Sequence, residues 1–240
     1  MHFSASRSRH IEIDIRVYAG IVFNPYLCNK VNRKTPYFPM PNTKALLLIF
    51  MRNPELGKCK TRLAASIGDK NALDLYKFLL LHTHNITKEL KVDKQVCYSD
   101  FLGKNDIWDT GYKKTIQIGK GLGERMANAF RDGFERGYKK IVIIGSDMYD
   151  LDGENLKTAF TALETHDYVI GPALDGGYYL LGMNTFDPVL FKDQDWGTDT
   201  VLQKTLTSLD KKKYFLLDPK NDIDHYGDIK DLEVFKPFLK

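Results

Sequence analysis

Two aspartates follow an apolar stretch of strand length in the middle of the chain. Residues 139–146 run from two lysines through four aliphatic residues and a Gly-Ser pair to Asp147, and Asp150 comes three residues later. This pattern predicts a buried strand that ends in carboxylates. Ligands of open α/β sheets bind outside the carboxyl ends of the strands, so Asp147 is a candidate ligand for a divalent cation beside a phosphorylated substrate. The alternative is that Asp147 and Asp150 cap a helix that begins near Asp152.

Three cations lie close together after an earlier apolar stretch. Residues 45–51 predict a strand, and the loop that follows contains Gly57, Lys58, Lys60 and Arg62 before the chain turns helical. A diphosphate needs several cations on one side, and the first turn of the next helix would add free backbone N–H groups. The loop matches neither the Walker A pattern nor G-x-G-x-x-G. A phosphate-binding loop and an ordinary basic surface loop both remain open.

Glycines also precede a predicted helix further along the chain. Gly119, Gly121 and Gly123 would allow close approach of a ligand to the backbone, and Arg125 would add a charge beside a nucleotide. A simple connecting turn is the alternative. The helix itself is predicted by an apolar stripe with helical spacing, which we assign to the core. The stripe consists of Leu122, Met126, Ala129, Phe130, Gly133 and Phe134.

Residues 168–182 contain two apolar stretches joined by a turn. A β-hairpin explains this outline. It does not explain why Pro172, Asp175 and two adjacent tyrosines, the first of them Tyr178, gather around one turn. Together these residues are typical of a polar substrate pocket with a flat apolar wall. We therefore favour a site here.

A late pair of acids, Asp222 and Asp224, has the spacing that places both side chains on one face of an extended segment. Such a pair can hold a divalent cation together with Asp147, whereas solvated loop acids are the alternative. A C-terminal helix is expected around Ile229 to Phe235, with Pro237 ending it.

The elements around these residues alternate between strands and helices. Helices are predicted at residues 69–88 and 152–164 from their apolar faces. This alternation, in a chain of 240 residues, predicts one α/β domain with a mostly parallel sheet flanked by helices.

Composition separates residues 1–39 from the remainder. Six Lys or Arg residues and two acids lie there, which accounts for the whole formal net charge of +4. We expect a leader outside the core, a start codon assigned too far upstream and a natural start at Met40.

Because the basic excess lies outside the motifs, we expect no nucleic-acid binding. No segment approaches the roughly 18 apolar residues of a membrane span, and three cysteines without paired spacing favour the reducing cytoplasm.

In their order along residues 44 to about 232, several motifs together resemble the DUF2064 group of transferases. The motifs are K-T-R-L at 60–63, L-G-E-R-M at 122–126, G-S-D-x-x-D-L at 145–151, G-P-A-x-D-G-G-Y-Y-L-x-G at 171–182, W-G-T at 196–198 and D-I-D at 222–224. The resemblance implies a single-domain GT-A fold of the nucleotide-diphospho-sugar transferase superfamily, of the kind named arsenosugar-biosynthesis-type glycosyltransferase. Two positions depart from the family pattern, Met148-Tyr149 in place of Cys-Pro and Gly121 in place of an acid.

The resemblance also implies roles for individual residues. Lys58, Lys60 and Arg62 correspond to the nucleotide-phosphate loop; Asp147, Asp222 and Asp224 correspond to the ligands of Mg²⁺ or Mn²⁺. The segment Asp175, Gly176, Gly177 and Tyr178 would face the transferred or accepting group, as would Trp196.

The function that follows is a cytoplasmic glycosyltransferase, with residues 40–240 as the transferase domain. It would use a nucleotide-sugar donor and a divalent metal to glycosylate a small acceptor, with Asp175 orienting or deprotonating the acceptor hydroxyl. The alternative is a nucleotidyltransferase that joins an NTP to a small phosphorylated or carboxylated substrate and releases pyrophosphate. A nucleotide-binding module without catalysis is the third reading, which Met148-Tyr149 alone suggests.

Overall fold

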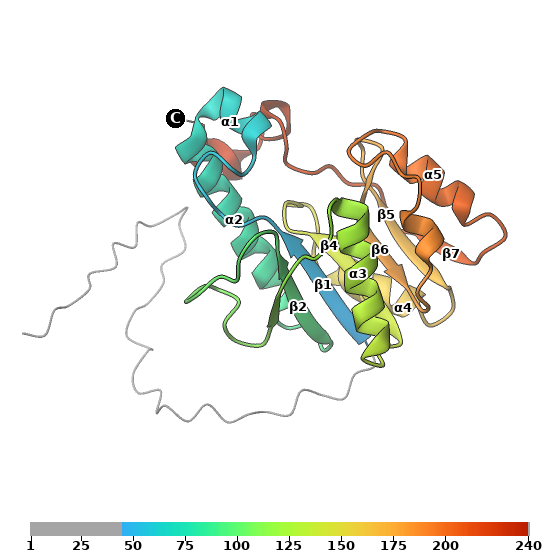
Figure 1. The fold of residues 1–240 in the computed structure, drawn as a ribbon. Coiled ribbons are helices and arrows are strands. Elements are labelled where there is room, and N and C mark those ends of the chain that lie inside the picture. The colour runs from blue at the N-terminus through green and yellow to red at the C-terminus, as the bar shows by residue number, and fades with distance from the viewer. Residues whose placement is uncertain (1–44, 240) are drawn as a thin grey trace, which may run out of the picture. The chain divides into compact units, whose positions relative to one another are not determined.

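The computed structural model describes residues 45–239, so the expectations for residues 1–39 and Met40 lie outside the described residues (Figure 1). The strands are β1 (Ala45–Met51), β2 (Asp93–Tyr98), β3 (Lys113–Ile116), β4 (Lys140–Gly145), β5 (Tyr168–Pro172), β6 (Tyr178–Met183) and β7 (Tyr214–Leu216). The α-helices are α1 (Thr61–Ile67), α2 (Asp69–Thr87), α3 (Leu122–Glu135), α4 (Gly153–Ala162) and α5 (Val201–Ser208). Short 3₁₀ helices are η2 (Pro188–Phe191), η3 (Tyr226–Asp228) and η4 (Glu233–Phe238). In this part of the chain no helix is both long and apolar enough to cross a bilayer.

The strands of residues 45–239 form one seven-stranded sheet in the order β3-β2-β1-β4-β6-β5-β7. All neighbouring pairs are parallel except those of β6, which runs antiparallel to both β4 and β5. The expected α/β fold with a mostly parallel sheet is therefore confirmed. The segment at 168–182 is also the hairpin that its outline predicted, because β5 and β6 pair directly.

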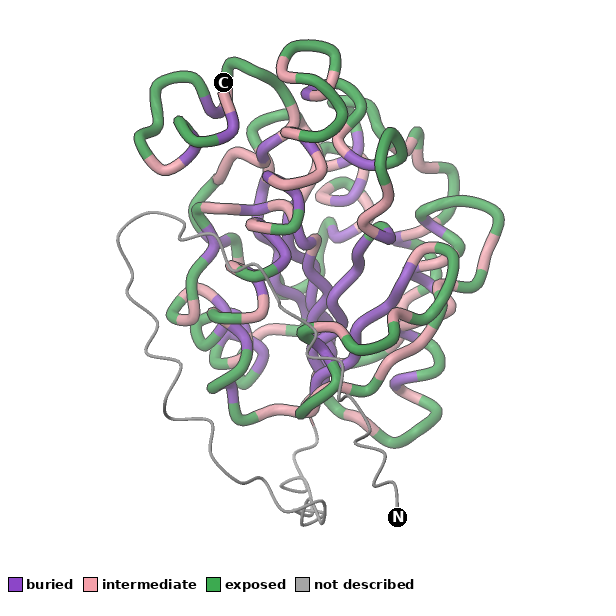
Figure 2. The backbone as a smooth tube through the Cα atoms, turned by 90° about the vertical axis from the view of Figure 1, so that its left-hand side faces the viewer, coloured by how far each residue is buried: buried purple, intermediate pink, exposed green. Residues whose placement is uncertain are grey.

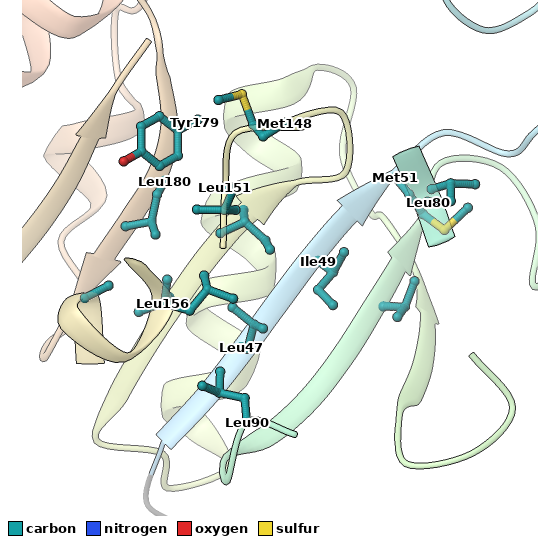
Figure 3. Close-up of a cluster of buried hydrophobic side chains, with 14 of the residues drawn as sticks. Leu47, Ile49, Met51, Leu80, Leu90, Met148, Leu151, Leu156, Tyr179 and Leu180 are labelled. Carbon is teal, nitrogen blue, oxygen red and sulfur yellow. The ribbon is translucent and has the colours of Figure 1, made fainter. Parts of the chain in front are cut away.

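Both faces of the sheet are covered, and β1 shows why its sequence is apolar throughout. Leu47, Ile49 and Met51 point to the side covered by α2 and α4 (Figure 3). Leu46 and Leu48 pack in the cluster on the other side, which α3 covers. A strand buried on both faces must be a continuous apolar run rather than an alternating one. Each of these fully buried side chains stabilises the fold by about 1.5 to 3 kcal/mol. In Figure 2 the buried stretches of the chain lie at the centre and the exposed residues lie around them.

The helices predicted at residues 69–88 and 152–164 are present as α2 and α4, and the structure identifies the N-cap of α4. Asp152 caps α4, accepting a hydrogen bond from the Asn155 N–H at 2.7 Å while the Asn155 side chain accepts from the Asp152 N–H at 3.2 Å. The alternative in which Asp147 and Asp150 cap this helix is wrong. Asp147 is therefore available for another role.

The C-terminal helix expected around Ile229 to Phe235 is not an α-helix, and Pro237 does not end it. The chain instead forms η3 and η4, and Pro237 lies inside η4. Its amide hydrogen bonds join residues three apart, as in Phe235 N–H to Leu232 C=O at 3.0 Å. In an α-helix the ring of Pro237 would clash with the carbonyl four residues earlier, which disfavours an α-helix at this position. Phe235 still packs in a buried cluster with Leu63 of α1, as the apolar spacing indicated.

Candidate active site

The carboxyl ends of β1 and β4 form the crevice around which the candidate residues gather. From β1 the chain continues to β2 on one side, whereas β4 pairs on its other side, so the strand order reverses between β1 and β4. Ligands of open α/β sheets bind at such a switch point. Because β6 runs antiparallel, its first residue, Tyr178, lies at the same edge of the sheet. The basic loop, Asp147 and the β5–β6 turn are thereby brought together.

A buried tyrosine ties the two strand ends together. The Tyr76 hydroxyl donates to the Arg52 carbonyl oxygen at 3.1 Å, accepts from the Arg52 N–H at 2.9 Å and lies 3.2 Å from the Ser146 hydroxyl oxygen. Burial raises the pKa of Tyr76, so its phenol stays protonated and able to donate. Tyr76 thereby holds Arg52, which follows β1, close to Ser146, which follows β4, at the point where the crevice opens.

The crevice contains two connected chambers. The larger has a volume of about 840 Å³ and the smaller about 230 Å³. The residues that line both are Phe50, Leu122, Gly145, Asp147, Asp175, Gly197 and Asp222. A volume of several hundred Å³ is typical of small-molecule sites.

Lys60 faces the acids across the larger chamber. Its Nζ lies 2.9 Å from Asp147 Oδ2, and only 6% of its side chain is exposed. Its backbone is left-handed, with φ 50° and ψ 43°, just before α1 begins. A residue other than glycine rarely adopts this backbone conformation, which costs of order 1–2 kcal/mol. Burial of the charge and strain of the backbone both mark Lys60 as a constrained residue.

The other two cations of the predicted loop differ from each other. Arg62 Nη1 donates to Asp224 Oδ2 at 2.7 Å, across the cleft. Lys58 pairs with Glu55 of its own loop at 3.1 Å, and its side chain is 69% exposed. All three line the larger chamber, whereas Gly57 does not, and its φ of +72° serves the preceding turn. The loop therefore presents Lys60 and Arg62 to the acids, with Lys58 at the rim.

The late acids are placed by the residue between them. Ile223 is buried among α1, α2 and the C-terminal segment, and its N–H donates to the Asp147 carbonyl oxygen at 3.2 Å. Asp222 lines both chambers, and Asp224 lines the larger one. Burial, and then the nearby charge of Asp147, raise the pKa of Asp222 to about 6. Within residues 45–239 the Asp222 carboxylate has no hydrogen bond or ion pair.

These acids suit a hard divalent cation in chemistry, since Mg²⁺ and Mn²⁺ prefer oxygen ligands. In this arrangement, however, Asp147 and Asp224 are each bound to a cation of the basic loop. Among the described residues, no three His, Cys, Asp or Glu side chains gather closely enough to hold a metal ion. The metal therefore stays a prediction, one that requires Lys60 and Arg62 to release their carboxylates.

The β5–β6 turn holds Asp175 by its own backbone. Asp175 Oδ1 accepts a hydrogen bond from the Gly177 N–H at 2.9 Å, and the Gly176 N–H donates to the Ala173 carbonyl oxygen at 3.1 Å. Asp175 Oδ2 makes no hydrogen bond with the described chain. Since Asp175 lines both chambers, this carboxylate stands at their junction.

The motif at 122–126 contributes both to packing and to the walls of the chambers. A Cβ on Gly123 would lie 2.2 Å from Nε1 of Trp196, so only glycine lets the indole rest on the start of α3. Arg125 donates to the Gly119 carbonyl oxygen at 3.1 Å and to Gln117 Oε1 at 3.3 Å. Arg125 lines the larger chamber, but Gly123 lines neither. Gly123 acts on the site through Trp196.

Trp196 and Tyr178 form the aromatic wall of the smaller chamber. Their ring centroids lie 6.3 Å apart in a T-shaped arrangement with an interplanar angle of 86°. The Tyr178 hydroxyl is buried without a partner among the described residues. Tyr178, Gly177 and Trp196 thus lie together as predicted, and Gly176 lies beside them in the turn.

Several residues of the larger chamber were missed by the sequence reasoning: Arg52, Ser99, Asp100, Gln117 and Lys120. Ser99 and Asp100 directly follow β2, so the signal that identified Asp147 would have found them once β2 was recognised. Asn53 joins this loop to the basic loop, because its Oδ1 accepts from the Asp100 N–H at 3.0 Å. The β1 and β2 loops are therefore one wall of the chamber.

Comparison with known proteins identifies the family of the chain. The model of the DUF2064 family, described as an uncharacterized protein conserved in bacteria, matches residues 82–198. A crystal structure from Desulfovibrio desulfuricans G20, described as a "putative nucleotide-diphospho-sugar transferase", is 31% identical, with a TM-score of 0.71 over 81% of this chain and 91% of that chain. No curated protein matches the chain.

Two more distant structures have lower identities and lower TM-scores. The bifunctional IspDF from Campylobacter jejuni is 10% identical, with a TM-score of 0.50 over 78% of this chain and 54% of that chain. The inositol-1-phosphate CTP transferase from T. maritima is 14% identical, with a TM-score of 0.47 over 83% of this chain and 96% of that chain. The Desulfovibrio relative, by contrast, is similar in sequence along nearly its whole length, and the chain belongs to the DUF2064 family.

Proposed function

We propose that this protein is a transferase that takes a nucleotide-diphospho-sugar as donor and transfers the glycosyl group to a small acceptor with the help of Mg²⁺ or Mn²⁺. The observation that carries the proposal is the division of the cleft. A large chamber lined by cations meets a small one with aromatic walls, and Asp147, Asp175 and Asp222 line both. The description of the Desulfovibrio relative as a nucleotide-diphospho-sugar transferase supports the same class.

The large chamber suits the nucleoside diphosphate. Lys60 and Arg62 are bound to carboxylates here, at 2.9 and 2.7 Å, so a diphosphate that replaces these carboxylates exchanges one charged hydrogen bond for another. Arg52, Lys120 and Arg125 line the same chamber. These cations would stabilise the charge that develops on the departing diphosphate.

The same exchange would free the carboxylates for a metal. Asp147 and Asp222, with Asp224, would hold it, and a bound cation would supply further neutralisation of the leaving group. The unpaired Asp222 carboxylate, in a region where burial and neighbouring acids raise its pKa, supports this assignment. The metal and the diphosphate would then bind together. The diphosphate would pair with Lys60 and Arg62, and the metal would pair with the carboxylates of Asp147 and Asp224 that these cations release.

Asp175 is the candidate base for the acceptor hydroxyl. The bond from the Gly177 N–H fixes Oδ1, and Oδ2 stays open at the junction of the chambers. A carboxylate held in this way can accept a proton from a hydroxyl placed in the smaller chamber. The acceptor would attack from that side while the diphosphate leaves from the other.

The donor can be identified directly from the product. Purified protein is incubated with Mn²⁺ and a panel of NDP-sugars, or with radiolabelled NTPs, in the presence of small alcohols, and free NDP and pyrophosphate are measured. We expect NDP release from at least one NDP-sugar. A matched variant, Asp175→Asn, retains the acceptor for the Gly177 N–H and should lose turnover while still binding NDP. Pyrophosphate release from an NTP without NDP release would replace this function by the nucleotidyltransferase alternative.

A further inference from the structure

The two chambers of the cleft differ in the charges of their walls. Among the described residues, those that line the smaller chamber include no Lys, Arg or His, whereas Asp147, Asp175 and Asp222 stand at its mouth. Cationic side chains line only the larger chamber, and they are Arg52, Lys58, Lys60, Arg62, Lys120 and Arg125. A group that enters the smaller chamber therefore meets the carboxylates of Asp175 and Asp222, which no described cation pairs, whereas Asp147 is already paired with Lys60 of the larger chamber.

The remaining wall of the smaller chamber is mostly apolar and includes the aromatic side chains of Trp196 and Tyr178. Trp196 lies against the start of α3, where Gly123 makes room for it, and Tyr178 meets it edge to face. Met126 and Ile143 complete the apolar side. Such a wall takes the apolar face of a ring or alkyl group, and the side-chain donors that it offers, such as the Tyr178 and Thr198 hydroxyls, carry no positive charge to pair with a phosphate.

An anion in this chamber would be disfavoured twice. It would lose its water without gaining a cation from the lining of this chamber, and it would lie beside the unpaired carboxylates of Asp175 and Asp222 in a partly buried region where charges are poorly screened. A diphosphate in the larger chamber adds negative charge at the shared mouth, and a metal held by Asp147 and Asp222 would offset part of it, so we expect the selection to be strongest without Mn²⁺. An uncharged or positively charged group meets neither penalty.

We infer that the smaller chamber selects its occupant by charge, and that the acceptor is an alcohol with an apolar face and no phosphate or carboxylate group. The inference rests on the proposed function in assigning the smaller chamber to the acceptor. It separates this protein from an enzyme that modifies a phosphorylated or carboxylated small substrate.

Trp196 makes the occupancy of the chamber measurable. The chain has two tryptophans, and Trp108, which is only 1% exposed, lines neither chamber. In protein labelled with 5-fluorotryptophan, the ¹⁹F resonance of Trp196 reports the smaller chamber and that of Trp108 serves as an internal control. A Trp196→Phe spectrum assigns the two lines.

The test compares benzyl alcohol with phenyl phosphate, two probes of similar ring but different charge. Both are titrated with and without Mn²⁺, in the presence of inorganic pyrophosphate that occupies the larger chamber. We expect benzyl alcohol to shift the Trp196 line with a dissociation constant at least tenfold lower than that of phenyl phosphate. A smaller ratio, or no shift of the Trp196 line by either probe, would overturn the inference.

A cation introduced into the wall of the smaller chamber should weaken the selection against the anionic probe. Thr198→Lys changes an exposed residue of the smaller chamber, and we expect it to lower the ratio of dissociation constants at least threefold. Leu122→Lys, on α3 and 47% exposed, is a second variant with the same expectation. Thr207→Lys, exposed on α5 and outside both chambers, should leave the ratio unchanged. An unaltered ratio in both chamber variants would contradict charge selection.

Pyrophosphate binding is followed separately by calorimetry. If pyrophosphate fails to bind, the proposed function fails, yet the ratio at Trp196 still decides the charge of the smaller chamber. If pyrophosphate binds and phenyl phosphate is preferred, the proposed donor site stands and the inference about the acceptor is wrong.

Discussion

Lys60 combines a strained backbone with a nearly buried charge, and Lys58, two residues earlier, has neither feature. Lys60 lies 2.9 Å from Asp147, whereas Lys58 pairs with Glu55 at the rim with a side chain that is 69% exposed. The two lysines therefore form a matched pair for testing the phosphate site. They share the loop and the charge, and they differ in whether they face the acids.

Replacing Lys60 by Met should weaken binding of a nucleoside diphosphate by about 1.5 to 3 kcal/mol, or roughly tenfold to more than a hundredfold, because one charged hydrogen bond is lost. Lys58→Met should cost less than about 0.5 kcal/mol, as is usual for an exposed ion pair. Calorimetry of both variants measures the difference. Equal losses would mean that Lys60 has no special place in the chamber.

Asp222 predicts a pH dependence of stability in metal-free buffer. Burial and Asp147 raise its folded pKa to about 6 from an ordinary value of 3.8. A raised pKa means that the proton favours the folded state, so this contribution is complete below pH 3.8 and is lost as the pH rises through 6. A shift of about two units corresponds to about 3 kcal/mol at most, and we expect ~1 kcal/mol because the side chain is only half-buried.

Asp222→Asn should therefore be more stable than the wild type at pH 7.5 and equal to it near pH 4. Urea unfolding at several pH values in the presence of EDTA measures this difference. The matched control is Asp218→Asn, which removes an exposed carboxylate outside both chambers and should follow the wild type at every pH. A variant at Asp222 with the pH profile of the wild type would rule out the coupling among these acids.

At the level of single residues, the sequence indicated which residues gather but not how each side chain points. Asp147 was identifiable because a polar residue directly follows a buried apolar strand. The contrast between Lys58 and Lys60 was not predictable from the sequence. It depends on the left-handed backbone of Lys60, and a lysine at that position does not indicate such a backbone. The packing of Trp196 on Gly123 was equally hidden, because the two residues are far apart in the sequence.

Among the elements, the β5–β6 hairpin controls the junction of the two chambers. Gly176 has a φ of +87°, and a Cβ there would lie 2.2 Å from the Asp199 carbonyl oxygen. The Leu202 N–H also donates to the Gly176 carbonyl oxygen at 2.9 Å, which joins the turn to the start of α5. The turn that carries Asp175 and the helix beside Trp196 are thus held as one unit.

Gly176→Ala should therefore destabilise the fold by more than about 2 kcal/mol, since it adds a clash with rigid backbone to the cost of a left-handed conformation. Gly197→Ala is the control, because Gly197 has a similar φ of +86° with nothing near its Cβ. It should cost only about 1 kcal/mol. Thermal unfolding compares the two, and losses of the same size would show that the contact with Asp199 is unimportant.

The elements themselves were largely predictable, and the failures have physical causes. The helices of residues 69–88 and 122–135 and the strands β1 and β4 followed from apolar periodicity, as expected for long segments that pack on a core. The antiparallel direction of β6 could be predicted only if the Asp-Gly-Gly segment was interpreted as the turn of a β-hairpin. At the C-terminus the apolar spacing did not distinguish an α-helix from the 3₁₀ helix that forms, and Pro237, which was expected to end the helix, lies inside it.

For the molecule as a whole, the topology explains why distant motifs act together. The reversal of strand order between β1 and β4 and the antiparallel β6 bring residues 52–62, 147, 175–178 and 222–224 to one edge of the sheet. The order of motifs predicted this fold through the family resemblance, and the Desulfovibrio relative supports it. The sorting of charge between two chambers was not predictable, because it depends on which side chains each chamber receives.

The central claim is that Asp147 couples a divalent metal to a nucleoside diphosphate in the larger chamber. The most direct test is the Mn²⁺-dependent rise in Tm at saturating NDP, measured in wild type, Asp147→Asn and Asp150→Asn. Asp150 lies in the same turn, exposed and outside both chambers, and is the matched control. At a hundredfold excess over Kd, ligand binding stabilises by about 2.7 kcal/mol, which corresponds to a rise of roughly 5 to 10 °C in a chain of this size.

We expect the full rise in the wild type and in Asp150→Asn, and no effect of Mn²⁺ in Asp147→Asn. Without Mn²⁺, Asp147→Asn should bind NDP at least as tightly as the wild type, because Lys60 no longer has a carboxylate partner to leave. This opposite pair of changes distinguishes a metal ligand from a residue that only maintains the fold. A full Mn²⁺-dependent rise in Asp147→Asn would contradict the account.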